Sequence, residues 1–183
     1  MSEILLISGS PTAPSKSAAL LSYSADFLRE RGITVKSVSV RDFPAEDLIQ
    51  ANYASPAFTE FKADIERVAA IVVATPIYKA AYTGSLKALL DILPQGALRG
   101  KTILPLATGG THAHQLAIDY ALKPVLAVLG ASDIQQGVYI VDNQFQTLPG
   151  GFKLDAELQT RLDDSLERLY RTVEALDSNA LSV

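Results

Sequence analysis

The stretch Ile4–Ser17, with the sequence ILLISGSPTAPSKS, decides the fold. It opens with an unbroken aliphatic run, Ile4 to Ile7, and then turns into small and hydroxyl-bearing residues. A short apolar run that ends at a turn signal is typical of a strand buried on both faces, as in parallel sheets. An amphipathic run that begins near Ser17 predicts the first helix.

A strand, a hydroxyl-rich loop and a helix N-terminus in this order favour an anion site, because N–H groups point outward and the helix dipole attracts negative charge. The loop carries four hydroxyls and one positive charge, on Ser10, Thr12, Ser15, Ser17 and Lys16. We therefore predict that it binds a phosphate. The alternative is a plain strand–helix connection capped by Ser15 or Ser17.

Two other phosphate-binding loops are excluded. The ATP-type loop needs Gly-x4-Gly-Lys-Ser/Thr, and no glycine lies between Gly9 and Lys16. The dinucleotide fingerprint Gly-x-Gly-x-x-Gly does not follow this strand either.

Length and composition predict one domain, spanning 1–183, with a sizeable core: the chain has 183 residues, of which 48% are hydrophobic. The net charge is −4 and there is no long basic run, so neither nucleic acid nor an anionic membrane is an expected partner. The absence of cysteine excludes disulfides and cysteine-ligated metals. No secretory segment or membrane-length apolar run is present, so we expect a soluble cytoplasmic protein.

The rest of the chain alternates predicted strands and helices. The strands are predicted at 4–7, 35–40, 70–74, 101–107 and 137–141, and the helices at 18–31, 57–69, 85–93, 113–129 and 156–176. Five such units predict an α/β, flavodoxin-like three-layer sandwich: a five-stranded parallel sheet in the order 2-1-3-4-5 with helices on both faces. The segment 142–151 is predicted to be a loop.

Two helices show an apolar stripe. In 113–129 the predicted buried side contains Leu116, Ala117, Tyr120, Ala121, Val125 and Leu129, and in 156–176 it contains Leu158, Leu162, Leu166, Leu169, Val173 and Leu176. Pro124 lies inside the first of these helices and predicts a kink or bulge there. Ser85 is the predicted cap of the helix before it.

Three loops are predicted to converge. In the order 2-1-3-4-5, ligands bind outside the carboxyl ends of strands 1, 3 and 4, and the loops at those ends are 9–17, 75–84 and 108–112. The second loop offers two tyrosines and exposed backbone to a flat ring, and Gly109 and Gly110 let a ligand approach the third loop closely. A phosphate at one end and a flat, polar-edged ring at the other describe FMN.

Three segments carry a family resemblance: GSPTAPSKS (9–17), ATPIYKAAYTGSLKALLDILP (74–94) and LPLATGGTHAHQLAIDYALKPVL (104–126). They resemble the NAD(P)H-dependent FMN reductases of bacterial sulfonate utilisation, and the resemblance extends to about Leu176. It implies a two-component system, in which this protein reduces FMN with NADPH or NADH. A separate FMNH2-dependent monooxygenase then uses the reduced flavin and O2 to desulfonate organosulfonates for sulfur assimilation. The resemblance also implies homodimers that assemble into homotetramers.

The resemblance assigns cofactor-binding residues position by position. It implies that Ser10, Ser15 and Ser17 hold the flavin phosphate, that Pro76, Ile77, Tyr78 and Lys79 pass along the isoalloxazine, and that Thr108, Gly109, Gly110 and Thr111 contact its pyrimidine edge. Many relatives have Arg where this chain has Thr12, which leaves Lys16 to supply the charge near the phosphate.

No catalytic side chain and no metal are expected. Hydride passes from the nicotinamide to the flavin between stacked rings, and backbone donors at 109–111 stabilise the charge that forms. FMN must then be released, so it acts as a substrate or loosely held cofactor. His112 and His114 have no nearby acidic third ligand in the sequence and make a poor metal site.

Tyr120 has two interpretations. Some of these reductases carry a one-residue π-type bulge in the fourth helix, next to a tyrosine at the subunit interface, and Tyr120 occupies the matching place. The alternative is a tyrosine in the core-facing stripe.

Two other functions stay open on the same fold. One is a quinone or azo-compound reductase with fixed FMN, and the other is a flavodoxin-type electron carrier that is not an enzyme. The sequence does not decide between NADPH and NADH.

Overall fold

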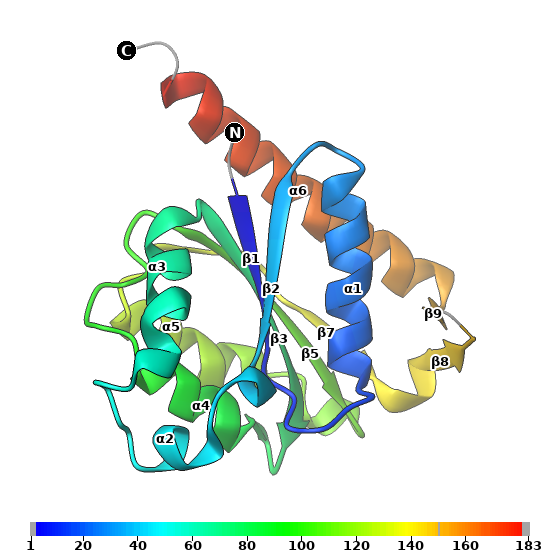
Figure 1. Cartoon of the computed structure of the whole chain (residues 1–183). Coiled ribbons are helices and arrows are strands. Elements are labelled where there is room, and N and C mark those ends of the chain that lie inside the picture. The colour runs from blue at the N-terminus through cyan, green and yellow to red at the C-terminus, as the bar shows by residue number, and fades with distance from the viewer. Residues whose placement is uncertain (1–2, 150, 181–183) are drawn as a thin grey trace.

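A mostly parallel sheet forms the middle layer of the computed structural model, which describes residues 3–149 and 151–180 (Figure 1). Its five longer strands are β1 (Glu3–Ser8), β2 (Thr34–Ser39), β3 (Ala70–Tyr78), β5 (Thr102–Gly109) and β7 (Val138–Val141). They pair in parallel in the order β2-β1-β3-β5-β7. Two short strands complete the sheet: β4 (Ala81–Tyr82) pairs antiparallel with β3, and β6 (Asp133–Ile134) pairs parallel with β5.

The layered α/β architecture confirms the predicted fold class, but the predicted five-stranded sheet with order 2-1-3-4-5 needs correction. Within the described residues the sheet has seven strands, and the order of its longer strands is β2-β1-β3-β5-β7. The two strands that the sequence did not indicate, β4 and β6, are each two residues long. An alternation of apolar and polar residues cannot be recognised over two residues.

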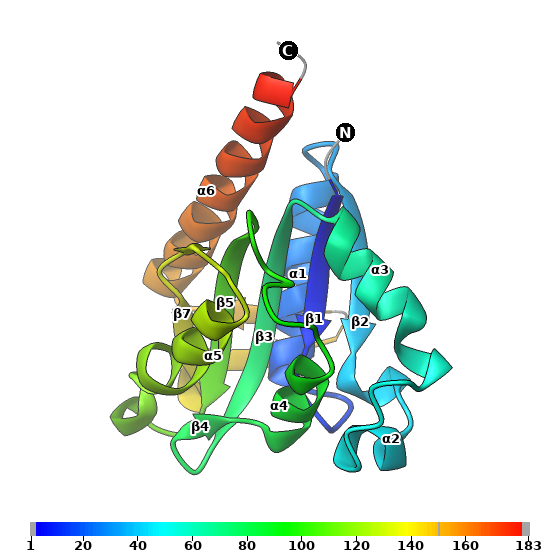
Figure 2. The ribbon, with the colours of Figure 1, turned by 90° about the vertical axis from the view of Figure 1, so that its left-hand side faces the viewer.

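Helices cover both faces of the sheet. The face under α1 (Lys16–Arg29) and α6 (Ala156–Ala180) is opposite the face under α3 (Thr59–Arg67), α4 (Gly84–Asp91) and α5 (Lys123–Val128) (Figures 1 and 2). Strand β1 contributes side chains to the core on both faces of the sheet, because alternate side chains of a strand point to opposite faces. Leu5 and Ile7 pack with α3 and α4, whereas Ile4 and Leu6 pack with α1 and α6. Figure 1 shows the last turns of α6 extending past the sheet edge at which β1 begins.

Shorter elements connect these layers. They are α2 (Ala45–Ile49), the 3-10 turns η1 (Val40–Asp42), η2 (Pro56–Phe58), η3 (His112–His114) and η5 (Asp142–Gln144), and the hairpin β8 (Phe145–Leu148) and β9 (Gly151–Leu154). The prediction of a loop over 142–151 was therefore wrong, since this segment contains a 3-10 turn, β8 and the start of β9. Gly150, in the predicted turn, lies outside the described residues.

The predicted helix 113–129 is interrupted by a π-helix, η4 (Ile118–Leu122). The N–H of Lys123 donates to the carbonyl of Ile118, five residues back. Pro124 follows at once and has no N–H to donate to the preceding turn, which agrees with an irregular helix at this point. The extra residue rotates the buried side of the helix, so that Leu122 and Leu126 are buried.

This rotation overturns part of the predicted stripe. Leu116 is 54% exposed and Tyr120 is 80% exposed, so neither lies in the core. The interpretation of Tyr120 as a core tyrosine is therefore wrong, and the π-type bulge is present. In α6 the predicted stripe is buried from Leu158 to Val173, but Leu176 is 44% exposed because the helix has by then passed the sheet.

A network of charges ties β1, β2 and α3 together at the edge of the sheet opposite the loops. Arg67 donates to both carboxylate oxygens of Glu3, at 2.6 and 3.2 Å. Arg67 and Lys36 each lie 2.7 Å from the buried carboxylate of Asp64. The hydrogen bonds from Arg67 hold the pKa of Glu3 below its ordinary value.

We predict that Glu3 contributes to acid sensitivity. Because its pKa is lower in the folded chain than in the unfolded one, its contribution is fully present above the unfolded pKa and is lost as the pH falls through the folded pKa. Glu3→Gln should therefore flatten the loss of stability below about pH 4.5, as measured by urea unfolding at a series of pH values. If the free energy of unfolding of Glu3→Gln fell as steeply with decreasing pH as that of the parent chain, the prediction would be contradicted.

Candidate functional site

The loop after β1 is fixed to the start of α4. The N–H of Gly9 donates to the carbonyl of Ala74 on β3 at 2.8 Å, and the carbonyl of Gly9 accepts a hydrogen bond of 2.5 Å from Thr83 Oγ1. A Cβ on Gly9 would lie 2.9 Å from the side chain of Leu86, so a larger residue would push the loop off α4. The first and second predicted loops are therefore in direct contact.

Thr83, and not Ser85, caps α4. Its Oγ1 accepts from the N–H of Leu86 at 3.1 Å, while Ser85 Oγ lies 3.2 Å from the same oxygen. Thr83 is 2% exposed and also bonds to Gly9, so one side chain both starts the helix and positions the first loop.

The N-terminus of α1 has unpaired donors at the position where an anion site was predicted. Ser15 is the N-cap: its Oγ accepts from the N–H of Ala18 at 3.1 Å and lies 3.4 Å from Ser17 Oγ. Among the described residues, the N–H groups of Ser15, Lys16 and Ser17 meet no acceptor. Unpaired N–H groups and a helix dipole at one point favour a bound phosphate.

The remaining loop hydroxyls are partly used by the loop itself. Ser10 is 1% exposed, and its Oγ donates to the carbonyl of Thr12 at 3.1 Å and accepts from the N–H of Thr12 at 3.3 Å. Ser10 therefore shapes the loop, and Thr12 lies exposed above it.

Lys16, the predicted charge near the phosphate, already has a partner. Its Nζ lies 2.8 Å from Asp142 Oδ1 and 3.2 Å from the carbonyl of Asp142. Asp142 follows directly after β7. The ion pair joins the N-terminus of α1 to a fourth loop at the same edge of the sheet, and it offsets the positive charge of Lys16.

The second loop is a tight hairpin between β3 and β4. Tyr78 pairs with Ala81, so only Lys79 and Ala80 form the turn. Both have positive φ, 50° and 64°, which matches the type I′ hairpin turn but is unfavourable for residues other than glycine, asparagine and aspartate. Strained turns of this kind concentrate at functional sites. Tyr78 is 51% exposed and Ile77 is buried.

Ala80→Gly tests this strain. Glycine adopts a positive φ without strain, which stabilises the folded chain, but it also raises the entropy of the unfolded chain, which destabilises the fold. We expect the first effect to be larger, for a net stabilisation of about 0.5 kcal/mol. Urea unfolding measures it, and Ala81→Gly in β4 is the matched control that should destabilise. A less stable Ala80→Gly chain would contradict the left-handed turn.

The third loop approaches its neighbours closely at Gly109. A Cβ there would lie 2.1 Å from Tyr139 Oη, which no side chain could accommodate without moving Tyr139. Tyr139 Oη donates to the carbonyl of Thr111 at 2.8 Å, and burial raises the pKa of Tyr139, which keeps the donor protonated. Among the described residues the N–H groups of Gly110 and Thr111 meet no acceptor.

The three loops meet at one edge of the sheet. Gly9 is bonded to Thr83, Pro76 pairs with Thr108, and the Cβ position of Gly109 lies 3.5 Å from Ile77. Free donors suited to a phosphate lie at the first loop and free donors suited to a polar ring edge lie at the third, with the Tyr78 hairpin between them. This arrangement fits FMN, because it supplies donors where the flavin carries its phosphate and its pyrimidine oxygens.

The π-helix packs against this edge. Ile118 and Ala117 form a small buried cluster with Ile77 and Ala107, and Tyr82 packs against the same cluster. Tyr120 is exposed and does not belong to this cluster. The bulge thus lies behind the second and third loops.

Three supporting residues were missed from the sequence: Thr83, Tyr139 and Asp142. Asp142 could have been found, because it directly follows a predicted strand at the same sheet edge as the three loops. Tyr139 faces Gly109 only through the pairing of β7 with β5, which no local pattern reveals. No group of three metal-ligating side chains occurs in the described ranges, and no described helix is long and apolar enough to span a membrane.

Comparison with known proteins decides the family. A family model described as NADPH-dependent FMN reductase matches residues 2–146. The chain belongs to this family. An FMN reductase (NADPH) from Escherichia coli (strain K12) is 44% identical over 174 residues, which cover 95% of this chain and 91% of the relative. An FMN reductase (NADPH) from Pseudomonas putida KT2440 is 45% identical over 169 residues, covering 91% and 86%.

Solved structures agree with the fold. The apo form of the NADH:FMN oxidoreductase EmoB superposes with a TM-score of 0.86 at 35% identity, over 94% of this chain and 90% of that one. A flavodoxin of Streptococcus pneumoniae TIGR4 matches at 14% identity with a TM-score of 0.64, over 94% of this chain and all of that one. The flavodoxin-like fold is thereby confirmed. The chain is an oxidoreductase of the FMN reductase family, which uses FMN and NADPH or NADH.

Proposed function

We propose that this FMN reductase binds FMN across the three loops and releases it, once reduced, to a separate monooxygenase that desulfonates organosulfonates. The observation that carries the binding mode is the convergence of free backbone donors from the first and third loops around the strained hairpin at Tyr78. The sulfonate role rests on the sequence resemblance. More distant relatives, at 31% identity, include the NADH-dependent FMN reductase SfnF of Pseudomonas putida.

Each loop has its own task in this proposal. The N–H groups of Ser15 to Ser17 and the hydroxyl of Ser15 hold the phosphate, with Ser10 shaping the loop and Lys16 nearby. The hydroxyl of Ser17 is buried 3.4 Å from Ser15 Oγ and supports that side chain from behind. Pro76, Ile77, Tyr78 and Lys79 border the ring along its length. Thr108, Gly109, Gly110 and Thr111 face its pyrimidine edge.

The protein's chemical contribution is positioning and charge stabilisation. FMN, when bound, accepts a hydride from the nicotinamide. The N–H groups of Gly110 and Thr111 have no acceptor among the described residues and would stabilise the negative charge that develops on a flavin bound at this loop, and as fixed dipoles they need no reorganisation. Tyr139 fixes the carbonyl of Thr111 by a hydrogen bond of 2.8 Å. No side chain is required as acid or base.

Release of the flavin follows from the charges around the phosphate. Lys16 is paired with Asp142, so no unpaired guanidinium or ammonium of the loop clamps the phosphate. Thr12 replaces the arginine of many relatives and brings no charge. Loose phosphate binding suits a reductase that hands over its product.

The test is steady-state oxidation of NADPH and NADH with added FMN or quinone, followed by coupling to a sulfonate monooxygenase. We expect a colourless purified protein with FMN-dependent turnover and sulfite release in the coupled assay. A yellow protein that ignores added FMN and reduces quinone would instead be the quinone or azo reductase. Tightly held FMN with little turnover would mark an electron carrier.

We further propose that Tyr120 lies at an interface between copies of this chain, in dimers that assemble into tetramers. Tyr120 and Leu116 are the large exposed apolar side chains of the bulged segment. Tyr120→Arg should shift the protein toward monomers in sedimentation velocity, because it places charge in an apolar contact. Val128→Arg, on the exposed side of α5, is a control at a separate position. An unchanged assembly in Tyr120→Arg would exclude this interface.

A further inference from the structure

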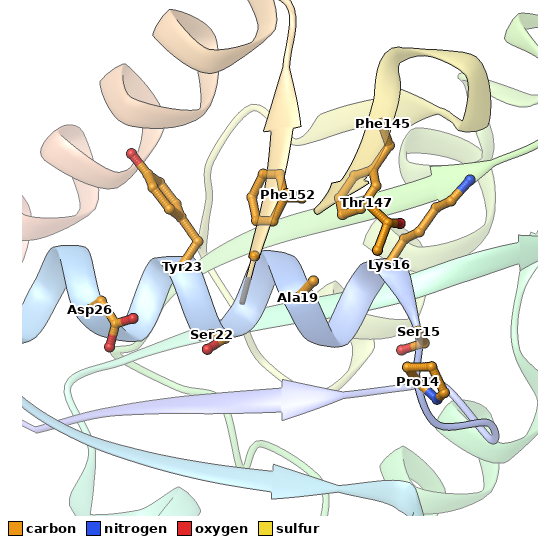
Figure 3. Close-up of a pocket in the computed structure, with 11 residues that line it drawn as sticks. Pro14, Ser15, Lys16, Ala19, Ser22, Tyr23, Asp26, Phe145, Thr147 and Phe152 are labelled. Carbon is orange, nitrogen blue, oxygen red and sulfur yellow. The ribbon is translucent and has the colours of Figure 1, made fainter. Parts of the chain in front are cut away.

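A second cleft begins at the predicted phosphate site, at the end of the first loop, and extends away from the other two loops. It has a volume of about 610 Å³ and lies between α1 and the β8–β9 hairpin. Its lining contains Ser15, Lys16, Ala19, Tyr23 and Phe152 (Figure 3). This volume is typical of a small-molecule site. Ser15 and Lys16 are shared with the proposed phosphate site, whereas Ala19, Tyr23 and Phe152 have no part in the proposed flavin arrangement.

The hairpin side of the cleft is aromatic. Phe145 and Phe152 stack with ring centroids 4.6 Å apart, and Tyr23 meets Phe152 edge-on at 5.8 Å. Figure 3 shows Ala19 pointing from α1 toward the hairpin, which leaves room between the helix and these rings. Phe145 is buried and one face of its ring is covered by Phe152, so Phe152 and Tyr23 are the half-buried rings that border the space. Such rings suit a flat heterocycle, which gains stacking energy there.

The two ends of the cleft differ in charge. At one end are Ser15 and Lys16, beside the free N–H groups of the α1 N-terminus. At the other end is the carboxylate of Asp26, whose contact with Arg29 is long, at 3.4 Å. Asp26 lies eleven positions after the N-cap Ser15, which corresponds to about 16 Å along the helix axis.

This order of groups matches one ligand. An adenosine 5′-phosphate moiety has an anion at one end, a flat ring system and an exocyclic amine that donates hydrogen bonds at the other end. Asp26 accepts from such an amine, Phe152 and Tyr23 stack on the ring, and the α1 N-terminus takes the phosphate. Guanine and hypoxanthine present a carbonyl in the same place, which a carboxylate disfavours.

We propose that the cleft between α1 and the β8–β9 hairpin binds the adenosine part of a dinucleotide. The proposal rests on the proposed phosphate site, because the cleft begins where that site ends. Two sources share this chemistry: the adenosine of FAD, joined to the flavin phosphate itself, and the adenosine of NADPH or NADH.

The first experiment detects adenosine directly. With saturating FMN present, adenosine should shift the NMR ring signals of Phe152 and Tyr23, and inosine should bind about tenfold more weakly, the discrimination expected for one hydrogen bond to a charged group. Ala19→Phe fills the cleft and should abolish the adenosine shifts. Ala175→Phe, at an exposed position of α6, is the matched control that should keep them. Asp26→Asn should reduce the preference for adenosine over inosine.

The second experiment identifies the source. The ratio of KM for FAD to KM for FMN, and the ratio for NADPH to reduced nicotinamide mononucleotide, are compared between Ala19→Phe and the parent chain. An increase of about tenfold in one of these ratios identifies that dinucleotide as the one whose adenosine occupies the cleft. No adenosine shift, a shift that survives Ala19→Phe, or two unchanged ratios would each overturn the proposal.

These outcomes are separate from those of the proposed function. If the three loops do not bind FMN, turnover with FMN fails in the parent chain, whatever adenosine does. A thermal melt of Ala19→Phe shows whether the variant is folded. If it is not, Asp26→Asn at the exposed end of the cleft decides by the adenosine and inosine comparison alone.

Discussion

Replacing Gly109 by alanine should lower kcat/KM for FMN by about a hundredfold. The new Cβ would lie 2.1 Å from Tyr139 Oη and 3.0 Å from the ring carbon that bears it, so Tyr139 must move and release the carbonyl of Thr111. The donors at Gly110 and Thr111 would then shift relative to the flavin edge, and misplacement by about 1 Å can cost two orders of magnitude. Stopped-flow flavin reduction measures the effect.

Two variants separate this cause from a general loss of stability. Gly84→Ala is the matched control, because a Cβ on Gly84 meets nothing within 4 Å and its φ is not positive. It should keep full activity. Gly109→Ala combined with Tyr139→Phe removes the 2.1 Å contact and should recover part of the lost activity. A Gly109→Ala enzyme with normal turnover would show that the third loop does not face the flavin.

Replacing Asp64 by asparagine should destabilise the fold by about 3 kcal/mol, at the lower end for loss of one partner of a buried ion pair. The Asp64 side chain is 1% exposed and holds Lys36 from β2 and Arg67 from its own helix, both at 2.7 Å. Asparagine keeps the shape but removes the charge that both cations face. Urea unfolding at pH 7 measures the change, with FMN turnover at low temperature expected to be unaffected.

The control is another acidic residue in an ion pair of similar length. Asp91 lies 2.6 Å from Lys87, but both side chains are 45% exposed. Asp91→Asn should change stability by no more than about 0.5 kcal/mol, because water screens an exposed pair. Equal effects of Asp64→Asn and Asp91→Asn would mean that burial does not set the strength of the first pair.

Elements with a long, uniform pattern were predictable from the sequence. The five longer strands lie within a few residues of their predicted ranges, and α1 and α6 were predicted with nearly correct starts. Their apolar residues repeat over two or more turns or fill a whole strand. From them the layered α/β architecture and the meeting of the three loops followed without any contact being known, whereas the seven-stranded order of the sheet did not.

Elements whose form depends on tertiary contact were not predictable in the same way. The hairpin β8–β9 is held by the Phe145–Phe152 stack and by its position against α1, and its four-residue strands show no clear alternation. The same holds in the site. Lys16 was assigned to the phosphate because its sequence neighbours are hydroxyls, but the fold brings Asp142 from 126 residues away to pair with it.

The direction of α6 matters for any use of this reductase on a surface. Its last turns lie past the sheet edge at which β1 begins, whereas the three loops proposed to bind FMN lie at the carboxyl ends of the strands. A linker attached to the end of α6 would therefore orient the reducing edge toward the medium when the protein is immobilised on an electrode or resin. Attachment through the exposed Lys79 would instead turn that edge toward the support.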